Sequence, residues 1–351
     1  MRLHVSPRKE LTVLRPESTS RRKLPVNLNP DDQGLFSHEL ERVIPETRLL
    51  ELRGVSVSSE GVLFQKGQML PESFAYSHTR ASWKRRSVVK FFLNNYLLRR
   101  RRRFEKEGVW VTDDWGGGYF HWLADVLPRL ITVSEQLKDL FLLLPRRYQE
   151  MEFVQASLKT FSIGGIEYIE PDEVLLCWKL LVPTQTAPSG HYNEGLIREV
   201  RSLQVDCYAN DVRDRADNRI YISRSQAPKR RISNEAEVIE VLRQFDFRIV
   251  RTEELSFPEQ VRVASGSRYI VSNHGAGLTN ILFMNPASSV FELRRTNDRI
   301  NNCYFTLASA LNLNYFYQNC EPHNPGEDAH TADLQVDLRA LRVNLELMLK
   351  S

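Results

Sequence analysis

The chain has 351 residues, of which 42% are apolar and 26% charged, and this is ordinary for a soluble globular protein of about two domains. Its four cysteines are too few for a disulfide scaffold, and none forms the Cys-x-x-Cys pair of a structural zinc site. The net charge of +4 is uneven, because residues 1–110 carry 22 Lys and Arg against 12 Asp and Glu. No segment reaches the roughly 20 apolar residues of a membrane span.

The first half of the chain carries irregular signals for secondary structure. Residues 1–35 are rich in Pro, Ser and charge, and we expect an extended arm there. The stretch 56–64 predicts a hairpin with Glu60-Gly61 at its turn. Apolar residues at helical spacing over 119–137 predict a helix that Pro128 kinks or divides. Other elements expected in this half are strands at 108–113 and 141–145, a helix at 151–161, strands flanking Pro171-Asp172, and a helix after the turn at 188–190.

Strands and helices alternate regularly in the second half, which predicts an α/β fold with a parallel, doubly wound sheet. Asn234, with Glu237 three residues on, has the spacing of a helix capping box. The expected strands are 219–223, 247–250, 269–272, 288–294 and 315–318, and the expected helices are 235–244, 256–265, 303–311 and 333–349.

A domain boundary is expected near 205–218, because this stretch is polar and lacks apolar periodicity. We therefore expect a first domain at 1–210 and a second at 211–330. A C-terminal helix within 331–351 can pack back on the first domain.

Basic residues are densest between Arg80 and Lys106. A run of such residues attracts phosphate, anionic lipid or nucleic acid. The simplest interpretation is a solvated helix end and loop, and the second is a surface for an anionic membrane or a lipid-phosphate acceptor. Nucleic acid is disfavoured, since no recognised nucleic-acid motif accompanies the charge. The core of the run is Arg99, Arg100, Arg101, Arg102 and Arg103.

The sequence VSNHGAGLTNILF at 271–283 places a polar cluster and two glycines between a strand and a helix. In a parallel sheet this turn lies at the carboxyl edge, where ligands bind. Gly275 and Gly277 let the backbone approach a ligand, and a helix N-terminus offers free N–H groups to a diphosphate. The turn matches neither a P-loop nor a dinucleotide fingerprint. Taken alone, His274 is more often a structural histidine than a catalytic one.

The stretch YISRSQAPKRRISNE at 221–235 also begins at a strand end, and it gathers four basic residues within eight positions before a helix. Arginine is suited to bidentate phosphate binding, so this loop predicts a polyanion site. The alternative is a solvated basic loop. The four residues are Arg224, Lys229, Arg230 and Arg231.

A third signal is WGGGYFHWLADVLPRL at 115–130, where His121 and Asp125 share one helix face at i and i+4. A carboxylate beside a histidine orients it and stabilises its charge, as in general-base pairs. The alternative is a half-buried histidine in an ordinary helical pair.

Taken together and in this order, the three segments resemble glycosyltransferase family 61, over roughly residues 108–318. The resemblance rests on GYFHWLADVLPRL, on YISR followed by RRISNE, and on SNHGAGLTN followed by VFEL. It implies a GT-B fold, in which two Rossmann-like domains face a cleft. It also implies an inverting transfer from a UDP-sugar to a hydroxyl group.

The resemblance assigns roles to individual residues. His121 or Asp125 is the expected catalytic base. Glu292 is expected to accept hydrogen bonds from ribose hydroxyls, the alternative being a salt-bridged or helix-capping carboxylate. No obligatory metal is expected, because the chain has only the pair Asp113-Asp114 and no DxD run in an obvious loop. The residues expected to bind the nucleotide-sugar are Arg224, Arg230, Asn234, Glu235, His274, Gly275, Ala276, Gly277, Leu278, Asn280 and Glu292.

The eukaryotic members of that family carry a leader or anchor and often disulfides, and the sequence shows neither. A bacterial, cytoplasmic enzyme of capsule or lipopolysaccharide biosynthesis is therefore expected, and a peripheral contact with the inner membrane is a further expectation. Its expected partners are a UDP-sugar and a glycan or lipid-linked glycan, without nucleic acid. The alternatives are a UDP-sugar epimerase or hydrolase on a similar fold, and a non-catalytic sugar-nucleotide-binding subunit of a polysaccharide assembly complex.

Overall fold

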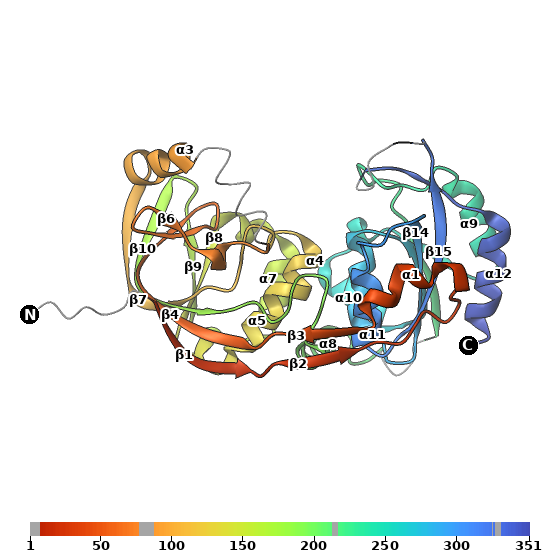
Figure 1. The fold of residues 1–351 in the computed structure, drawn as a ribbon, viewed down its shortest axis with the longest axis horizontal. Helices are drawn as coiled ribbons and strands as arrows, with labels where there is room; N and C mark the ends of the chain where they lie inside the picture. Colours follow the sequence, from red (N-terminus) through yellow and green to blue (C-terminus); the bar gives the residue numbers. More distant parts are fainter. Residues whose placement is uncertain (1–7, 77–87, 213–216, 325, 327–330) are drawn as a thin grey trace, which may run out of the picture. The chain divides into compact units, whose positions relative to one another are not determined.

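A computed structural model describes residues 8–76, 88–212, 217–324, 326 and 331–351. The described residues form two compact units, drawn in Figure 1. The first unit falls within Met1–Ser18 and Ile44–Ser189, and the second within Thr19–Val43 and Gly190–Ser351. No helix in these described ranges is long and apolar enough to cross a bilayer.

The first unit is built on a mixed sheet in the order β6-β5-β4-β10-β7-β8-β9, with β1 paired to β4. Strands β10, β7, β8 and β9 are parallel, whereas β4 is antiparallel to its neighbours. The hairpin expected at 56–64 is confirmed, because Gly61 takes a φ of +91° between β4 and β5. The strands are β1 Arg8–Arg15, β4 Thr47–Ser58, β5 Leu63–Gln65, β6 Gln68–Met69, β7 Arg100–Val109, β8 Phe141–Pro145, β9 Gly165–Ile169 and β10 Glu173–Pro183.

The helix expected at 119–137 is divided, as predicted, although the division begins before Pro128. A π-helical turn, η5 (Trp122–Val126), separates α4 (Tyr119–His121) from α5 (Leu127–Ile131). Because proline has no N–H to donate, the backbone must leave the regular hydrogen-bond pattern near this point. The other helices of this unit are η3 Pro71–Ser73, α3 Val88–Leu93, η4 Asn94–Leu98, α6 Ser134–Leu137, η6 Arg146–Glu150 and α7 Glu152–Leu158.

The second unit contains the parallel, doubly wound sheet that the strand–helix alternation predicted. Its order is β12-β11-β13-β14-β15-β16, in which the first five strands are parallel and β16 is antiparallel. Counted along this unit, the parallel strands stand in the order 2-1-3-4-5, so the winding reverses between β11 and β13. The strands are β11 Asn218–Ile222, β12 Arg248–Val250, β13 Ser267–Asn273, β14 Ser289–Arg295, β15 Asn314–Pro322 and β16 Leu334–Gln335.

Helices α9 and α12 lie side by side, as Figure 1 shows; α12 packs on β15 and α9 contacts β12. Elsewhere in the chain, β2 (Ser18–Arg21) pairs with β3 (Glu41–Ile44) in a separate two-stranded sheet. The helices of the second unit are η1 Pro30–Asp32, α1 Gln33–Phe36, η2 Ser37–Glu39, α8 Glu194–Tyr208, α9 Glu235–Gln244, η8 Thr252–Glu254, α10 Phe257–Ser265, η9 Ala276–Phe283, α11 Cys303–Ala310 and α12 Leu338–Leu349.

The expected boundary near 205–218 is wrong, because this polar stretch lies inside the second unit. Helix α8, which precedes it, packs on α10, α11 and η9 through a buried apolar face. The expected arm at 1–35 is also only partly extended. Residues 19–43 belong to the second unit, where Phe36 packs its ring against Phe305 and Tyr317.

Two local expectations near the ends of helices are corrected as well. Helix α12 packs within the second unit, where Leu341, Leu345 and Met348 belong to the hydrophobic core. Asn234 does not cap α9, because its side chain bonds both backbone groups of Val336 instead. The capping box forms on α10, between Ser256 and Glu259.

Leu345→Ala is expected to lower the free energy of unfolding of the second unit by about 2–5 kcal/mol, because it leaves a cavity in the core. The control is Val343→Ala on the same helix, where the native side chain is 61% exposed; its effect should stay within about 0.5 kcal/mol. Urea denaturation measures both. Equal losses for the two variants would contradict the packing of α12 described above.

Candidate functional site

The strand order of the second unit reverses between β11 and β13, and the carboxyl ends of strands at such a reversal are where doubly wound folds bind ligands. Arg224 follows β11 after one residue, and His274 and Gly275 follow β13 directly. Two of the motifs found in the sequence therefore meet at one edge of the sheet. This edge is the position where ligands bind in doubly wound folds.

The Arg224 guanidinium packs directly on the backbone of Gly275. A Cβ added at Gly275 would lie 2.2 Å from Nη1 and 2.3 Å from Cζ of Arg224. Any other residue at position 275 would therefore displace the arginine. A glycine is required here because the Arg224 side chain approaches its backbone closely. The sequence analysis expected a close approach by a ligand, and the neighbour found in the structure is the arginine.

Arg224 and Arg230 place two guanidinium groups near each other beside the glycine turn. Neither forms an ion pair within the described part of the chain, and the Nε atom of each is buried without a hydrogen bond. Burial lowers the pKa of Arg224, and the nearby Arg230 lowers it further. Two such guanidinium groups are suited to an anionic ligand with several oxygen atoms, such as a diphosphate.

Arg230 is held in an unusual backbone conformation, with a φ of +56°. The buried side chain of Asn273, at the end of β13, donates a hydrogen bond to the Arg230 carbonyl oxygen. The Arg230 N–H donates to the carbonyl of Thr331 at 3.3 Å. These contacts fix the loop that carries the second guanidinium.

His274 is oriented by the fully buried Glu292. The Nδ1 atom of His274 lies 2.6 Å from Oε1 of Glu292, and Oε2 accepts a hydrogen bond from the Tyr315 hydroxyl at 2.5 Å. Burial and the neighbouring carboxylate raise the pKa of Tyr315 well above its usual value, which keeps the hydroxyl protonated as a donor. Both carboxylate oxygens are thus occupied. Glu292 therefore positions His274, and its expected contact with ribose hydroxyls stays a prediction.

Asn234 and Glu235 do not line the site; their side chains bind residues of the surrounding fold. Glu235 Oε1 accepts hydrogen bonds from the Tyr221 hydroxyl at 2.9 Å and from Ser223 Oγ at 2.8 Å. These bonds brace the end of β11 immediately before Arg224. Asn234 is bound to Val336, as described above.

The turn after β13 continues into a 3-10 helix, η9, and not into an α-helix. Ala276 and Gly277 open it, and a Cβ at Gly277 would lie 3.1 Å from Cγ2 of Ile222, so this glycine allows η9 to pack closely on β11. Leu278 is buried in the core, and Asn280 is buried with its amide donating to Gln260 and to the Gly277 carbonyl. These last two side chains therefore hold the turn in place.

The first unit contains the expected His121–Asp125 pair. His121 Nδ1 lies 2.7 Å from Asp125 Oδ2, and the His121 side chain is 18% exposed. Ser189, which sequence analysis singled out only as part of a turn, donates to the same Oδ2 at 2.7 Å and lies 3.2 Å from Nδ1. The ring of Trp115 packs edge-on against the imidazole at 4.9 Å between centroids. With Nδ1 held by the carboxylate, Nε2 is the nitrogen left to accept a proton.

Asp113 and Asp114 both form hydrogen bonds with nearby backbone groups and so stabilise the local structure. Asp113 accepts hydrogen bonds from the backbone N–H groups of Trp115 and Gly116 at 3.0 Å and pairs with Arg129 at 3.6 Å. Asp114 accepts a hydrogen bond from the N–H of Ala75 at 2.9 Å. Among the described residues there is no cluster of three or more His, Cys, Asp or Glu side chains that could hold a metal ion.

The arginine run is not the solvated helix end and loop that was the simplest interpretation. Only Arg99 caps the preceding helical turn, and the other four arginines lie in β7. Arg99 pairs with Glu60, and Arg102 pairs with Glu167 and Glu173. Three of the five are therefore engaged by carboxylates, since Arg100 also reaches Glu173 at 3.3 Å.

The fold and the site define an α/β protein with two arginines and a glycine turn at a strand edge in one unit and a His–Asp pair in the other. Residues 119–291 match the family model described as Glycosyltransferase 61. The matched region begins two residues before His121 and ends one residue before Glu292.

Three relatives of this chain carry names of sugar transferases. A protein O-linked-mannose beta-1,4-N-acetylglucosaminyltransferase 2 from Takifugu rubripes is 42% identical over 108 residues, which are 28% of this chain and 18% of the relative. EGF domain-specific O-linked N-acetylglucosamine transferases from Mus musculus and Drosophila melanogaster are 32% and 31% identical over 102 and 121 residues. These matches cover 28% and 31% of this chain and 19% and 23% of the relatives.

The matched part of the chain thus spans about a fifth of the length of these curated relatives. The family match and the relatives support glycosyltransferase family 61, as the resemblance in the sequence predicted. Proteins of this family and these relatives are glycosyltransferases.

Gly275→Ala is expected to lower affinity for UDP about 10- to 100-fold, because the added methyl group displaces Arg224 and removes a charge-assisted contact. The fold should persist, since the displaced atoms belong to the end of a flexible side chain. The control is Gly195→Ala, where the new Cβ would meet Asn193 at an ordinary 3.5 Å. Calorimetric titration with UDP measures both, and undiminished binding by Gly275→Ala would contradict the role given to Arg224.

Proposed function

We propose that the protein is an inverting glycosyltransferase that moves a sugar from a UDP-sugar to a hydroxyl of a glycan. The observation that carries this proposal is the pair of unneutralised guanidinium groups, Arg224 and Arg230, beside the glycine turn at the reversal of strand order. The match to glycosyltransferase 61 over 119–291 supports it.

The proposed reaction is one displacement at the anomeric carbon. The acceptor hydroxyl oxygen forms a bond to that carbon while the bond to the diphosphate oxygen breaks, and the UDP leaves as an anion. Arg224 and Arg230 stabilise the charge that develops on the leaving diphosphate. They can do so without a metal, so no divalent cation is assigned to the reaction. His274, positioned by Glu292, offers Nε2 to the bound nucleotide.

His121 is proposed to accept the proton of the acceptor hydroxyl through Nε2. The Asp125 carboxylate holds Nδ1 and stabilises the imidazolium that forms, while Ser189 holds the carboxylate in place. This reaction uses groups from both units, as in the GT-B arrangement of two domains facing a cleft. That arrangement is part of the proposal.

The biological setting is proposed on the sequence alone. A role in surface polysaccharide biosynthesis, a bacterial source and a cytoplasmic location, peripheral on the inner membrane, all remain predictions. Because the names of the relatives specify transfer of N-acetylglucosamine, UDP-N-acetylglucosamine is the first donor to test.

Arg224→Ala is expected to weaken UDP binding about 10- to 100-fold, since a hydrogen-bonded charge contact contributes about 1.5–3 kcal/mol. The measurement is calorimetry with UDP, ADP, GDP and CMP in the absence of added metal. Arg231→Ala is the matched control from the same loop, because Arg231 is engaged by Asp333. Failure of the folded wild-type protein to bind any of the four nucleotides, with or without Mn²⁺, would overturn the proposed donor site.

His121→Ala and Asp125→Asn are expected to reduce sugar transfer about 10²- to 10⁴-fold, the usual contribution of a general base. Affinity for UDP should be unchanged in both variants. The assay follows UDP release from UDP-sugars in the presence of a glycan acceptor panel. UDP-sugar consumption without acceptor would indicate a hydrolase, interconversion of the sugar an epimerase, and binding without turnover a non-catalytic subunit.

A further inference from the structure

The run of arginines is divided by the geometry of the strand that contains it. Successive side chains of a strand point to opposite faces of the sheet. Arg100 and Arg102 lie on the face where Glu173 is buried, and both pair with it. Arg101 and Arg103 therefore lie on the opposite face, and both are exposed.

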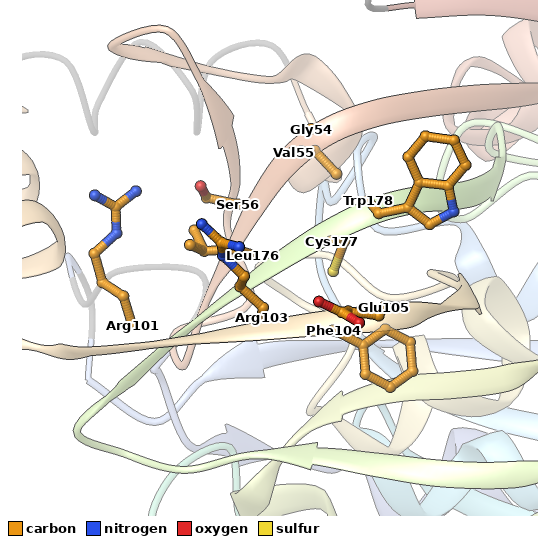
Figure 2. A pocket seen from close by; sticks show the side chains of 10 residues that line it. All are labelled: Gly54, Val55, Ser56, Arg101, Arg103, Phe104, Glu105, Leu176, Cys177 and Trp178. Carbon is orange, nitrogen blue, oxygen red and sulfur yellow. The ribbon is translucent and has the colours of Figure 1, made fainter.

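On that opposite face, β4, β7 and β10 form an open pocket of about 430 Å³. Figure 2 shows Arg101 and Arg103 pointing to the same side of β7, with the Trp178 indole on β10 beyond Arg103. Part of the face is covered by an apolar cluster that includes Phe64, Phe91 and Val174. The pocket is lined by Gly54, Val55, Ser56, Arg101, Arg103, Phe104, Glu105, Leu176, Cys177 and Trp178.

The aromatic side of the pocket is fixed in place and accessible. Trp178 is 52% exposed although it lies in the middle of a strand. The Arg53 guanidinium lies over its ring at 4.7 Å, and Arg53 is in turn paired with Glu51 at 2.6 Å. An indole held in this way presents both an apolar surface and a polar N–H group, as tryptophans do at membrane interfaces.

Exposed leucines lie at the end of the helical segment that leads directly into β7. Leu97 is 73% exposed and Leu98 is 77% exposed, both in η4, and Leu93 at the end of α3 is 49% exposed. Figure 1 shows α3 at the end of the sheet where β7 begins. Leucines beside basic residues and an interfacial tryptophan are the combination that binds an anionic lipid surface.

We propose that this surface docks the first unit on an anionic membrane, with lipid phosphate groups in the pocket at Arg101 and Arg103 and with Leu97 and Leu98 in contact with the acyl chains. The proposal narrows the membrane contact predicted for the whole run to Arg101 and Arg103, because these two are exposed and line the pocket. Glu105 is the one carboxylate in the pocket lining and opposes the binding of phosphate. Docking of the enzyme is independent of the proposed donor site, so the two can be tested separately.

The test is cosedimentation of the full chain with vesicles of phosphatidylglycerol and phosphatidylcholine, and with vesicles of phosphatidylcholine alone. Binding is expected only to the anionic vesicles and should weaken as salt is raised. Arg101→Gln combined with Arg103→Gln should lower the partition coefficient about 30-fold, since each basic residue near the surface contributes about fivefold. Glu105→Gln should raise it.

The matched control removes the same charge from the other unit, by Arg243→Gln with Arg342→Gln on α9 and α12. This control should bind vesicles as the wild type does. Leu97→Asn with Leu98→Asn tests the apolar contact at exposed positions that the fold does not depend on, and it should also weaken binding. UDP binding by each variant, measured in parallel, should stay unchanged and shows that the protein is folded.

Equal weakening by the pocket variant and the control would overturn the proposal, since it would show attraction by net charge alone. Absence of binding to anionic vesicles by a protein that binds UDP would also overturn it. A soluble acidic oligosaccharide tests the remaining possibility, which is that the pocket binds an acidic glycan instead of lipid phosphate. If galacturonate oligosaccharides bind with the same dependence on Arg101 and Arg103 while vesicles do not, the pocket belongs to an acidic glycan and the membrane proposal fails.

Discussion

The contact between the Arg224 guanidinium and the bare backbone of Gly275 is the constraint on which the candidate site depends. Two guanidinium groups without counter-charges repel each other, and burial makes this more costly. The structure holds them in place through neighbouring contacts. Glu235 braces the end of β11, and Asn273 fixes the carbonyl of Arg230. Two guanidinium groups held this way make the edge a candidate for binding an anion, as proposed above.

The two candidate histidines are oriented by the same kind of contact, but their surroundings differ. In each, Nδ1 faces a carboxylate, so Nε2 is the ring nitrogen that this contact leaves available. Glu292 is fully buried and its second oxygen is held by Tyr315, whereas Asp125 is partly exposed and also accepts from Ser189. The rigid environment of His274 suits a fixed hydrogen-bonding role. The partly exposed carboxylate beside His121 suits the proton transfer proposed for that histidine.

The sequence predicted the second unit well, because the signals there are local. Its five parallel strands begin and end close to the expected positions, and the glycine turn lies where a strand-to-helix transition was expected. What sequence analysis missed depends on contacts between distant residues. Ser189 reaches Asp125 across 64 positions, and Asn234 binds Val336 across 102. Contacts between residues so far apart in the sequence cannot be predicted from local spacing. For the same reason the contacts of Glu292 with His274 and Tyr315 could not be predicted.

The domain boundary was misplaced for a related reason. A polar stretch without periodicity resembles a linker, yet at 205–218 it is the end of α8 and the connection to β11. The apolar face of α8 that packs on the second unit lies just upstream, and it decides to which unit the stretch belongs. Packing partners, and not local polarity, determine where a compact unit ends.

The use of arginine across the chain gives a physical criterion for separating structural from functional charge. Arg99 and Arg102 are engaged by carboxylates in the first unit, and such pairs neutralise charge within the fold. Arg224 and Arg230 have no carboxylate partner in the described residues, although burial makes an unneutralised charge costly there. The absence of a carboxylate partner for Arg224 and Arg230 among the described residues is what makes these two the candidates for binding an anion. In a run of identical residues only the three-dimensional structure reveals that division, because strand geometry sends alternate side chains to opposite faces.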